Sequence, residues 1–356
     1  MKVGVVGAGI VGRLLAWQLL QTGWQVNIFD ENHIQQKNNC SYVAAGLLSP
    51  YSELSKSCFL INKMGKQSIA LWKKIIASLN PTIYFQTKGS IVLAHQRDQP
   101  CLENQIKLIK NQLPNDQIQN LSAEKLIQLE PELSSHSFSA YYFPLEAQID
   151  SQEIMTQLQN CFLKKGGQWQ SDTKIVAIHP GTIKTSKKIY RFDLVVDCRG
   201  LAARKINGEN LRGIRGEMIK LHAPEVNLSR PIRLMHPRYP LYLVPRPNHI
   251  YLVGASEIEN EDYTPLSVRT CLELLTAVYS VHPGFAEARI MDLLVHCRPA
   301  FLNNLPGIFV ENGKIAINGL YRHGFLLAPF LIALIVDYLK NQYFPEEYAS
   351  LIKISQ

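Results

Sequence analysis

Apolar residues at the amino-terminal end of the chain show two kinds of pattern, one typical of buried strands and one typical of a helix. Stretches 2–6 and 25–29 are rich in β-branched residues and carry few charges, which is typical of buried strands in a parallel sheet. Between them, apolar residues within 11–19 recur at spacings of three and four, as on the buried face of a helix, and Gly23 can end that helix. This order of strand, helix and strand predicts a βαβ unit.

The middle of the chain continues in the same manner. Apolar spacing predicts a helix over 60–79, followed by two strands joined by a short turn at Lys88-Gly89. Asp150 stands three residues before Glu153, a capping-box arrangement that opens the next helix. The two strands that we expect to be joined are 82–86 and 90–94. The further strands that we expect in the first domain are 173–178 and 192–196.

After about residue 211 the pattern becomes rich in β-structure, with one helix at 267–281, which indicates a second domain. A strand at 314–318 and a helix after Leu326 then return the chain to the first domain. The sequence therefore predicts an α/β fold in which a Rossmann-like domain with a parallel sheet is interleaved with a smaller α+β domain built on an antiparallel sheet. The expected ranges are 1–81, 145–210 and 314–356 for the first domain, and 82–144 and 211–313 for the second.

Charge gives little evidence of a polyanionic partner. The 37 Lys and Arg residues exceed the 29 Asp and Glu residues, so the formal net charge is +8. Basic residues nevertheless occur in pairs at most, as at Lys73-Lys74 and Lys187-Lys188, and no basic tail is present. Nucleic-acid binding through a run of charge is therefore disfavoured, and we expect no nucleic-acid partner.

The seven cysteines are widely spread, with no CxxC pair and no Cys/His group at zinc spacing. We therefore expect reduced thiols, no bound metal and a cytoplasmic location. Lys2 is followed at once by the first strand, so no secretion signal is expected. The longest apolar run, 325–336, contains Pro329 and is shorter than the ~20 residues that span a bilayer, so we expect no membrane insertion. A homo-oligomer is compatible with these features, although the sequence does not specify the oligomeric state.

The turn between the first strand and helix reads Gly7-Ala8-Gly9-Ile10-Val11-Gly12. GxGxxG at this place permits a sharp turn and lets a pyrophosphate approach backbone N–H groups at a helix amino terminus, where the dipole favours negative charge. Asp30 ends the second strand and is followed by Glu31; a carboxylate at this position can accept hydrogen bonds from ribose hydroxyls. The fingerprint indicates an adenine dinucleotide but does not distinguish NAD from FAD.

Residues 39–50, Asn-Cys-Ser-Tyr-Val-Ala-Ala-Gly-Leu-Leu-Ser-Pro, resemble the S-x-x-A-A-G-M-L segment of the D-amino-acid oxidase superfamily, in particular of its glycine oxidase group. In that family the small residues allow a close approach to the pyrophosphate and to one flavin face. Further blocks are similar to glycine oxidase blocks in the same order, so the resemblance covers nearly the whole chain. These blocks are 147–150, 214–217, 242–246, 253–256, 297–299 and 319–329.

The resemblance implies FAD as the cofactor. The block at 319–329 also implies a helix whose amino terminus points at the flavin O2 edge and stabilises negative charge on the reduced ring. Val176 would contact the adenine half through its backbone, although a core valine is an equally good interpretation. The FAD-binding positions implied in this way are Ser41, Ala44, Ala45, Gly46, Leu47, Val176, Gly200, Gly319, Arg322, His323, Gly324, Phe325 and Leu326.

The same resemblance assigns three residues to the substrate. Arg298 matches the arginine that grips the substrate carboxylate, Arg322 a second arginine near it, and Tyr242 a tyrosine that hydrogen-bonds that carboxylate. A guanidinium suits this role because its planar fork pairs with a carboxylate through two hydrogen bonds and stays charged. Without the family, Arg298 would be interpreted as a strand-end arginine and Tyr242 as a core aromatic residue.

Several positions depart from the family pattern. Glu257 matters most, because it stands where glycine oxidases have a methionine that lines the pocket. Its carboxylate could attract a substrate ammonium or could face solvent. We count it among the candidate catalytic residues, with the hypothesis that it favours substrates with a cationic group. The other departures are Leu320 in place of histidine, His323 in place of asparagine, and Phe330 in place of a small residue.

The activity that the resemblance implies is FAD-dependent oxidation of glycine or another small amino acid or amine. Hydride would pass from the substrate Cα to flavin N5, and O2 would reoxidise the flavin to give H2O2. The implied biological role is supply of the imine of glycine for the thiazole of thiamine. Three alternatives stay open: a quinone-linked dehydrogenase of D-amino or N-methyl amino acids, the FAD part of a tRNA-modifying enzyme, and a non-catalytic FAD-binding protein.

Overall fold

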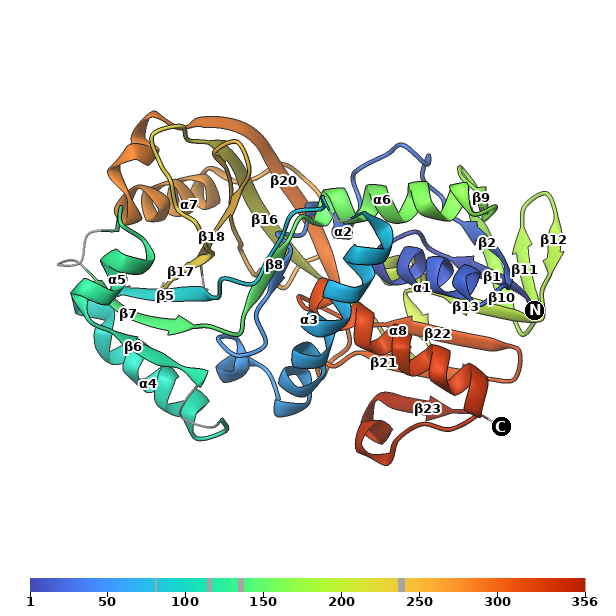
Figure 1. Cartoon of the computed structure of the whole chain (residues 1–356). Coiled ribbons are helices and arrows are strands. Elements are labelled where there is room, and N and C mark those ends of the chain that lie inside the picture. Colours follow the sequence, from blue (N-terminus) through green and yellow to red (C-terminus); the bar gives the residue numbers. More distant parts are fainter. Residues whose placement is uncertain (81, 114–116, 134–137, 236–240, 356) are drawn as a thin grey trace.

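The computed structural model describes residues 1–80, 82–113, 117–133, 138–235 and 241–355. Within these residues two large β-sheets lie side by side, each with its own layer of helices (Figure 1). Most strands of the first sheet run parallel, and nearly all neighbours in the second run antiparallel. The predicted combination of a Rossmann-like parallel sheet with an antiparallel sheet is confirmed.

The first sheet has seven strands within the described residues. Their spatial order is β23 (Ile352–Ile354), β21 (Gly307–Glu311), β22 (Lys314–Asn318), β13 (Leu194–Asp197), β1 (Lys2–Val6), β2 (Gln25–Phe29) and β9 (Gln168–Gln170). The strands from β22 to β9 are parallel, and β21 is antiparallel to β22. Because β21 belongs to this sheet, we propose that the first domain resumes at β21, before residue 314. Of the expected boundaries, position 81 lies outside the described residues.

Helices pack on one face of this sheet and a small sheet packs on the other (Figure 1). The helices are α1 (Ile10–Gln21), α3 (Phe59–Leu79), α6 (Ser151–Lys164) and α8 (Gly324–Asn341). The small antiparallel sheet consists of β10 (Ile175–His179), β11 (Thr182–Thr185) and β12 (Ile189–Arg191). Ile183 of β11 and Phe192 lie close to Gly4, since a Cβ there would be 2.6 Å and 2.7 Å from their side chains. The strand expected at 173–178 corresponds to β10. It belongs to this small sheet, which covers the second face of the parallel sheet.

The capping box predicted at Asp150 forms only in part. The Asp150 carboxylate accepts the Glu153 backbone N–H at 2.9 Å, as an N-cap does. Glu153 does not reach back; its carboxylate accepts the backbone N–H of Tyr84 at 3.0 Å. The start of α6 is thereby connected to Tyr84, which directly precedes the strand Phe85–Gln86.

The second sheet has eight strands within the described residues. Their order is β20 (Arg289–Ala300), β16 (Arg212–His222), β19 (Ile250–Gly254), β18 (Leu241–Arg246), β17 (Ile232–Leu234), β5 (Ser90–His95), β7 (Phe138–Phe143) and β6 (Gln119–Leu121). Helices α7 (Val268–Val281) and α5 (Ala123–Leu129) pack on one face, and α4 (Gln99–Lys110) packs on the other at the β5 end. Shorter elements are β14 (Lys205–Ile206), β15 (Glu209–Asn210) and 3₁₀ turns at Leu54–Lys56, Gln96–Asp98, Gly200–Ala203, Pro283–Glu287 and Glu346–Leu351.

The strands expected at 82–86 and 90–94 do not form a hairpin. β5 pairs with β7 and β17, whereas β4 (Phe85–Gln86) pairs with β8 (Ala147–Ile149) in a separate sheet that also contains β3 (Leu47–Leu48). β5 is buried on both faces, because Ile91 and Leu93 enter one apolar core and Val92 and Ala94 another. Because the backbone of such a strand is shielded from water, its N–H and C=O groups need a neighbouring strand on each edge.

A buried arginine connects the antiparallel sheet to the smaller β3–β8–β4 sheet. Arg246, at the end of β18, donates to the Gln148 side chain at 2.6 Å and to the Ile149 carbonyl at 2.7 Å, and it also bonds to the Ala45 carbonyl. Burial lowers the pKa of this guanidinium. Its hydrogen bonds fix segment 44–47 against β18.

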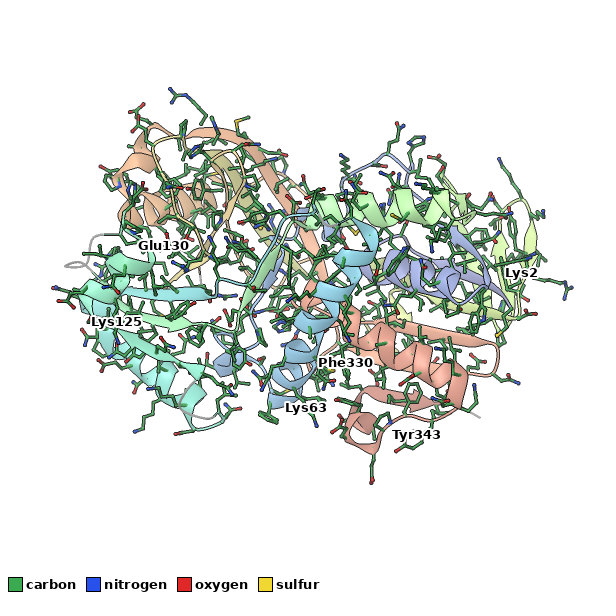
Figure 2. All side chains as sticks on the ribbon, viewed as in Figure 1. Lys2, Lys63, Lys125, Glu130, Phe330 and Tyr343 are labelled. Carbon is green, nitrogen blue, oxygen red and sulfur yellow. The ribbon has the colours of Figure 1, made fainter. Side chains whose placement is uncertain are left out.

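Helix α8 meets the length and composition of a membrane span among the described residues, but 56% of it is buried within the protein. It packs against α1 and α3, and the Trp72 indole donates to the Phe325 carbonyl at 2.7 Å. Phe330, labelled in Figure 2, lies on α8 and packs against Tyr348 at a ring distance of 4.9 Å. The departure from a small residue at this position therefore fills core space.

We predict that Gly12→Ala lowers the free energy of unfolding by about 1–3 kcal/mol, as overpacking does. A Cβ at Gly12 would lie 1.9 Å from the Gly7 carbonyl oxygen, so helix α1 would have to move away from β1. Urea unfolding measures the change. Gly324→Ala is the control, because its Cβ would meet only the Ile10 side chain at 3.8 Å; equal losses in both variants would contradict the prediction.

Candidate active site

A cavity of about 800 Å³ lies where the two large sheets meet. One side is lined by the turn between β1 and α1 and by the amino terminus of α8, and the other by residues of β16, β18 and β20. This volume is in the upper part of the range of about 300–1,000 Å³ typical of ligand pockets. The cavity therefore brings together the two sets of residues that the sequence assigned to a cofactor and to a substrate.

The turn before α1 leaves its helix amino terminus open towards the cavity. Gly9 is the N-cap and provides no side-chain cap, and a Cβ there would meet only the Ser41 hydroxyl, at 3.3 Å. The Ile10 N–H donates to that hydroxyl at 2.9 Å. Because the first N–H groups of a helix lack intrahelical partners, this end can accept an anion such as a pyrophosphate.

Asp30 lies at the end of β2, beside this turn. Its carboxylate accepts the Ala8 N–H at 2.6 Å and the Asn32 N–H at 2.9 Å, and both Asp30 and Glu31 line the cavity. Each carboxylate oxygen has two lone pairs. Asp30 therefore stabilises the glycine turn and keeps acceptor capacity for hydroxyl groups of a ligand.

Segment 41–47 forms the next part of the wall and begins with α2 (Cys40–Val43). The Asn39 side chain caps α2 by accepting the Ser41 and Tyr42 N–H groups at 3.1 Å and 3.2 Å. A Cβ at Gly46 would lie 1.9 Å from the Ile149 carbonyl oxygen, and its φ of +71° suits glycine. The buried Ser49 hydroxyl lines the cavity and has no hydrogen-bond partner among the described residues. The orphaned Ser49 hydroxyl and the helix end without an N-cap side chain fit a bound dinucleotide, whereas Gly46 is required by the close approach of the Ile149 carbonyl.

Most of the residues predicted to bind the cofactor line the cavity, but three do not. Gly12 packs α1 onto β1, as the clash with Gly7 shows. Gly319 has a φ of +74°, and a Cβ there would lie 2.2 Å from the Phe301 ring, so this glycine makes room for a core aromatic. The Val176 side chain is 60% exposed on β10, and Ile175 beside it lines the cavity instead. Those that do line it are Gly7, Ala8, Gly9, Ile10, Val11, Asp30, Glu31, Ser41, Ala44, Ala45, Gly46, Leu47, Gly200, Arg322, His323, Gly324, Phe325 and Leu326.

Arg298 comes from β20 and lies over Gly216 of β16. A Cβ at Gly216 would be 2.4 Å from its Nη2 atom, so the glycine provides the space for the guanidinium. Nη1 donates to the Ser256 carbonyl at 3.2 Å. Among the described residues no carboxylate forms an ion pair with Arg298. The side chain is half-buried in the cavity wall and can bind an anion.

Tyr242 lies on β18 on the same side of the cavity. Its hydroxyl donates to the Met218 sulfur at 3.0 Å, a weak acceptor. Burial raises the pKa of Tyr242, partly offset by Arg298 and Arg233. The phenol thus stays protonated and can donate to a carboxylate held by Arg298.

Arg322 is placed differently from Arg298, because two carboxylates flank it. Its Nε and Nη2 atoms donate to Glu53 at 2.9 Å and 2.8 Å, and its Nη1 donates to Glu257 at 3.2 Å. Burial lowers the pKa of Arg322, but Glu53 and Glu257 outweigh it and raise the pKa above the ordinary value. Arg322 lines the cavity as predicted, yet its charge is already balanced.

Glu53 connects Arg322 to a second arginine that the sequence analysis missed. Arg233 of β17 donates to Glu53 at 2.5 Å, and the His323 ring lies 3.6 Å from it. Burial raises the pKa of Glu53, but Arg322 and Arg233 hold it well below its usual range. No sequence signal marked Arg233, since a charged residue between Ile232 and Leu234 is also what a strand with one solvent-facing side shows; only the structure shows that it is buried.

Glu257 turns toward its protein neighbours. Besides Arg322, it accepts a short hydrogen bond from the Tyr321 hydroxyl. Burial and the contact with Glu257 both raise the pKa of Tyr321. Its side chain is nevertheless 33% exposed, so Glu257 lies at the rim of the cavity with both protein partners and contact with solvent. Tyr321 has a φ of +51°, a conformation that its sequence neighbours do not indicate.

His323 is a buried neutral base beside this cluster. Burial lowers its pKa to about 4, with Arg322 and Arg233 acting in the same direction and Glu53 opposing them. An unfolded histidine has a pKa of about 6.5. As the pH falls from 6.5 to 4, the unfolded chain takes up a proton that the folded chain does not, so stability falls with pH in this window.

We predict that His323→Asn flattens this dependence. Between pH 7 and pH 5 the wild-type free energy of unfolding should fall by roughly 1–2 kcal/mol more than that of the variant, at up to ~1.4 kcal/mol per pH unit. Urea unfolding at both pH values measures it. Glu53 contributes stability above its unfolded pKa, which is lost only at lower pH, so it leaves this window unaffected. Parallel pH profiles of the two proteins would contradict the assignment.

Comparison with known proteins agrees with this geometry. Residues 2–338 match the family described as FAD dependent oxidoreductase, DAO. A Rhizobium etli protein that carries the name thiamine biosynthesis oxidoreductase ThiO is 32% identical over 351 residues, which cover 98% of this chain and 100% of that protein. The crystal structure of glycine oxidase from Geobacillus kaustophilus superposes with a TM-score of 0.86 at 22% identity, covering 99% of this chain and 98% of the other. The crystal structure of iminodiacetate oxidase from Chelativorans sp. gives 0.83 at 20% identity, covering 99% of each. The chain belongs to the DAO family of FAD-dependent oxidoreductases.

Proposed function

We propose that this FAD-dependent oxidoreductase oxidises glycine or another small amino acid, and that its product serves thiamine synthesis. The observation that carries the proposal is Arg298, a cavity-lining guanidinium with no carboxylate partner among the described residues. A small α-amino acid provides that carboxylate. The names of the Rhizobium etli relative and of the Geobacillus kaustophilus glycine oxidase support the reaction and its role.

The residues that would hold FAD are those of the first turn and of segment 41–49. The amino terminus of α1 would bind the pyrophosphate, Asp30 the ribose, and Ser49 a polar group of the ligand. When bound, FAD supplies the two-electron acceptor for a hydride from the substrate α-carbon and returns the electrons to O2 as H2O2.

The protein contributes orientation and charge. Arg298 and Tyr242 fix the substrate carboxylate, and so determine which way the Cα–H bond points. In this part of the cavity Glu53 and Glu257 both accept hydrogen bonds from Arg322, so neither is an unengaged general base. The substrate therefore has to bind as, or become, the neutral amine without a dedicated protein carboxylate.

We also propose O2 as the electron acceptor and the cytoplasm as the location. All seven cysteines are free, which agrees with a reducing compartment. Anaerobic mixing with a panel of small amino acids tests the reaction, since a substrate bleaches the flavin absorbance. Subsequent admission of O2 should yield one H2O2 per substrate; recovery of the colour only with a quinone would favour the dehydrogenase alternative.

Gly9→Val should abolish retention of FAD. The Cβ position has room in the folded protein, with only Ser41 at 3.3 Å, but the side chain would occupy the space that the pyrophosphate needs. Flavin absorbance per protein after gel filtration measures retention, and the circular dichroism spectrum should stay that of the wild type. A yellow Gly9→Val protein would show that the pyrophosphate lies elsewhere.

Arg298→Ala should reduce kcat/KM for the amino-acid substrate roughly 30- to 800-fold, because a desolvated charge-assisted pair contributes about 2–4 kcal/mol. Arg298→Lys should recover only part of the loss, since an ammonium cannot form two parallel hydrogen bonds. FAD content should stay near wild type. A simple amine without a carboxylate serves as the control substrate; an equal loss for it would assign Arg298 a structural role.

A further inference from the structure

Binding of one substrate carboxylate requires one available arginine, but the site contains a further arginine, Arg322, that is already paired with carboxylates. Arg298 alone has no carboxylate partner among the described residues, while Arg322 lies between Glu53 and Glu257. The two contacts are unequal. Glu53 receives two hydrogen bonds from Arg322 at 2.9 Å or less, whereas Glu257 receives one at 3.2 Å, on Nη1. Nη1 is thus the part of Arg322 that Glu257 alone occupies.

The two glutamates also differ in burial. The Glu53 side chain is 13% exposed and is shared with Arg233 and His323, so it is part of the fixed structure. The Glu257 side chain is 33% exposed and lines the cavity with Tyr321 and Arg322. Glu257 therefore lies at the place where a second anion from a ligand would otherwise meet Arg322 and the Tyr321 hydroxyl.

Charge balance in this part of the cavity leads to the same conclusion. Three arginines, Arg233, Arg298 and Arg322, face two glutamates, Glu53 and Glu257, and His323 is neutral. Of these three, Arg298 is the arginine that has no carboxylate partner among the described residues, which matches one substrate carboxylate. A second carboxylate would find no cation without a carboxylate partner among the described residues and would approach Glu257, a like charge.

We propose that Glu257 acts as a built-in substitute for a second substrate carboxylate, and that it restricts the enzyme to amino acids with a single carboxylate. The proposal rests on the proposed function and names the substrate class for it. A substrate ammonium is a weaker partner for Glu257, because Arg322 already neutralises this carboxylate and Tyr321 already donates to it. These contacts favour exclusion of dicarboxylates over the cationic-substrate hypothesis, which stays a prediction.

Binding measurements with FAD-loaded protein test the proposal without turnover. Acetate, malonate, succinate and glutarate are titrated at constant ionic strength, and the change in flavin absorbance gives each Kd. In the wild type no dicarboxylate should bind more tightly than acetate. In Glu257→Gln at least one should gain roughly 10- to 100-fold relative to acetate, the range expected for a new hydrogen bond to a charged group. Glu257→Met should show the same gain.

Glu259→Gln is the matched control. It makes the same charge change two residues away, on a side chain that is 66% exposed and pairs with Arg212 outside the cavity lining. Its ratio of dicarboxylate to acetate affinity should equal that of the wild type. An equal gain in Glu259→Gln, or no gain in either Glu257 variant, overturns the proposal.

Turnover separates this proposal from the proposed function. The Glu257 variants should raise kcat/KM for iminodiacetate relative to glycine by the same factor as the binding ratio. A wild type that oxidises no amino acid refutes the proposed function, whereas the Kd ratios would still decide the role of Glu257.

Discussion

The Arg246 guanidinium holds together the parts of the molecule between which the cavity lies. It extends from the end of β18 and bonds to carbonyls or side chains at Ala45, Gln148 and Ile149. A buried cation of this kind is costly unless each N–H group finds an acceptor. The three acceptors lie on two other segments of the chain. They can all reach the guanidinium only when both segments lie at a fixed distance from the end of β18. The wall made by segment 44–47 is therefore fixed relative to the antiparallel sheet.

A second buried charge extends this order to the substrate end. Glu146 is fully buried, and its carboxylate accepts the Tyr51 and Ser52 N–H groups at 3.1 Å and 2.7 Å and the Ser52 and Ser90 hydroxyls. This positions the loop directly before Glu53. Glu53 in turn orders Arg233 and Arg322, because its carboxylate accepts charge-assisted hydrogen bonds from both guanidinium groups.

The chemistry follows from which charges are satisfied. Arg322 is balanced by Glu53 and Glu257, whereas Arg298 bonds to backbone carbonyls alone among the described residues. Two arginines that look alike in sequence thus differ in their hydrogen-bond partners. One organises the cavity, and the other is available to a ligand anion beside the Tyr242 hydroxyl. The amino terminus of α1 lines the other end of the same cavity, so most of the residues predicted for the cofactor and those predicted for the substrate border one cavity.

Local features of the sequence were sufficient for a large part of this description. The βαβ fingerprint is a local motif, since strand, glycine turn and helix are contiguous, and it fixed the cofactor end. The family blocks pointed to Arg298 and Tyr242, which line the same cavity in the structure; their role in binding substrate stays a prediction. The capping residue Asp150 and most strand positions were likewise readable from short stretches.

Only the tertiary structure decided which side chains meet across long distances in the chain. Glu53 and Arg322 are 269 residues apart, and Glu257 and Arg322 are 65 apart. Periodicity could not show that β4 pairs with β8 instead of β5, nor that Gly319 makes room for Phe301 instead of FAD. The sequence by itself determined the βαβ cofactor end and the residue types at the substrate end, because these depend on neighbours along the chain. The charge state and availability of each arginine depend on partners brought close by folding, and these only the packed structure defines.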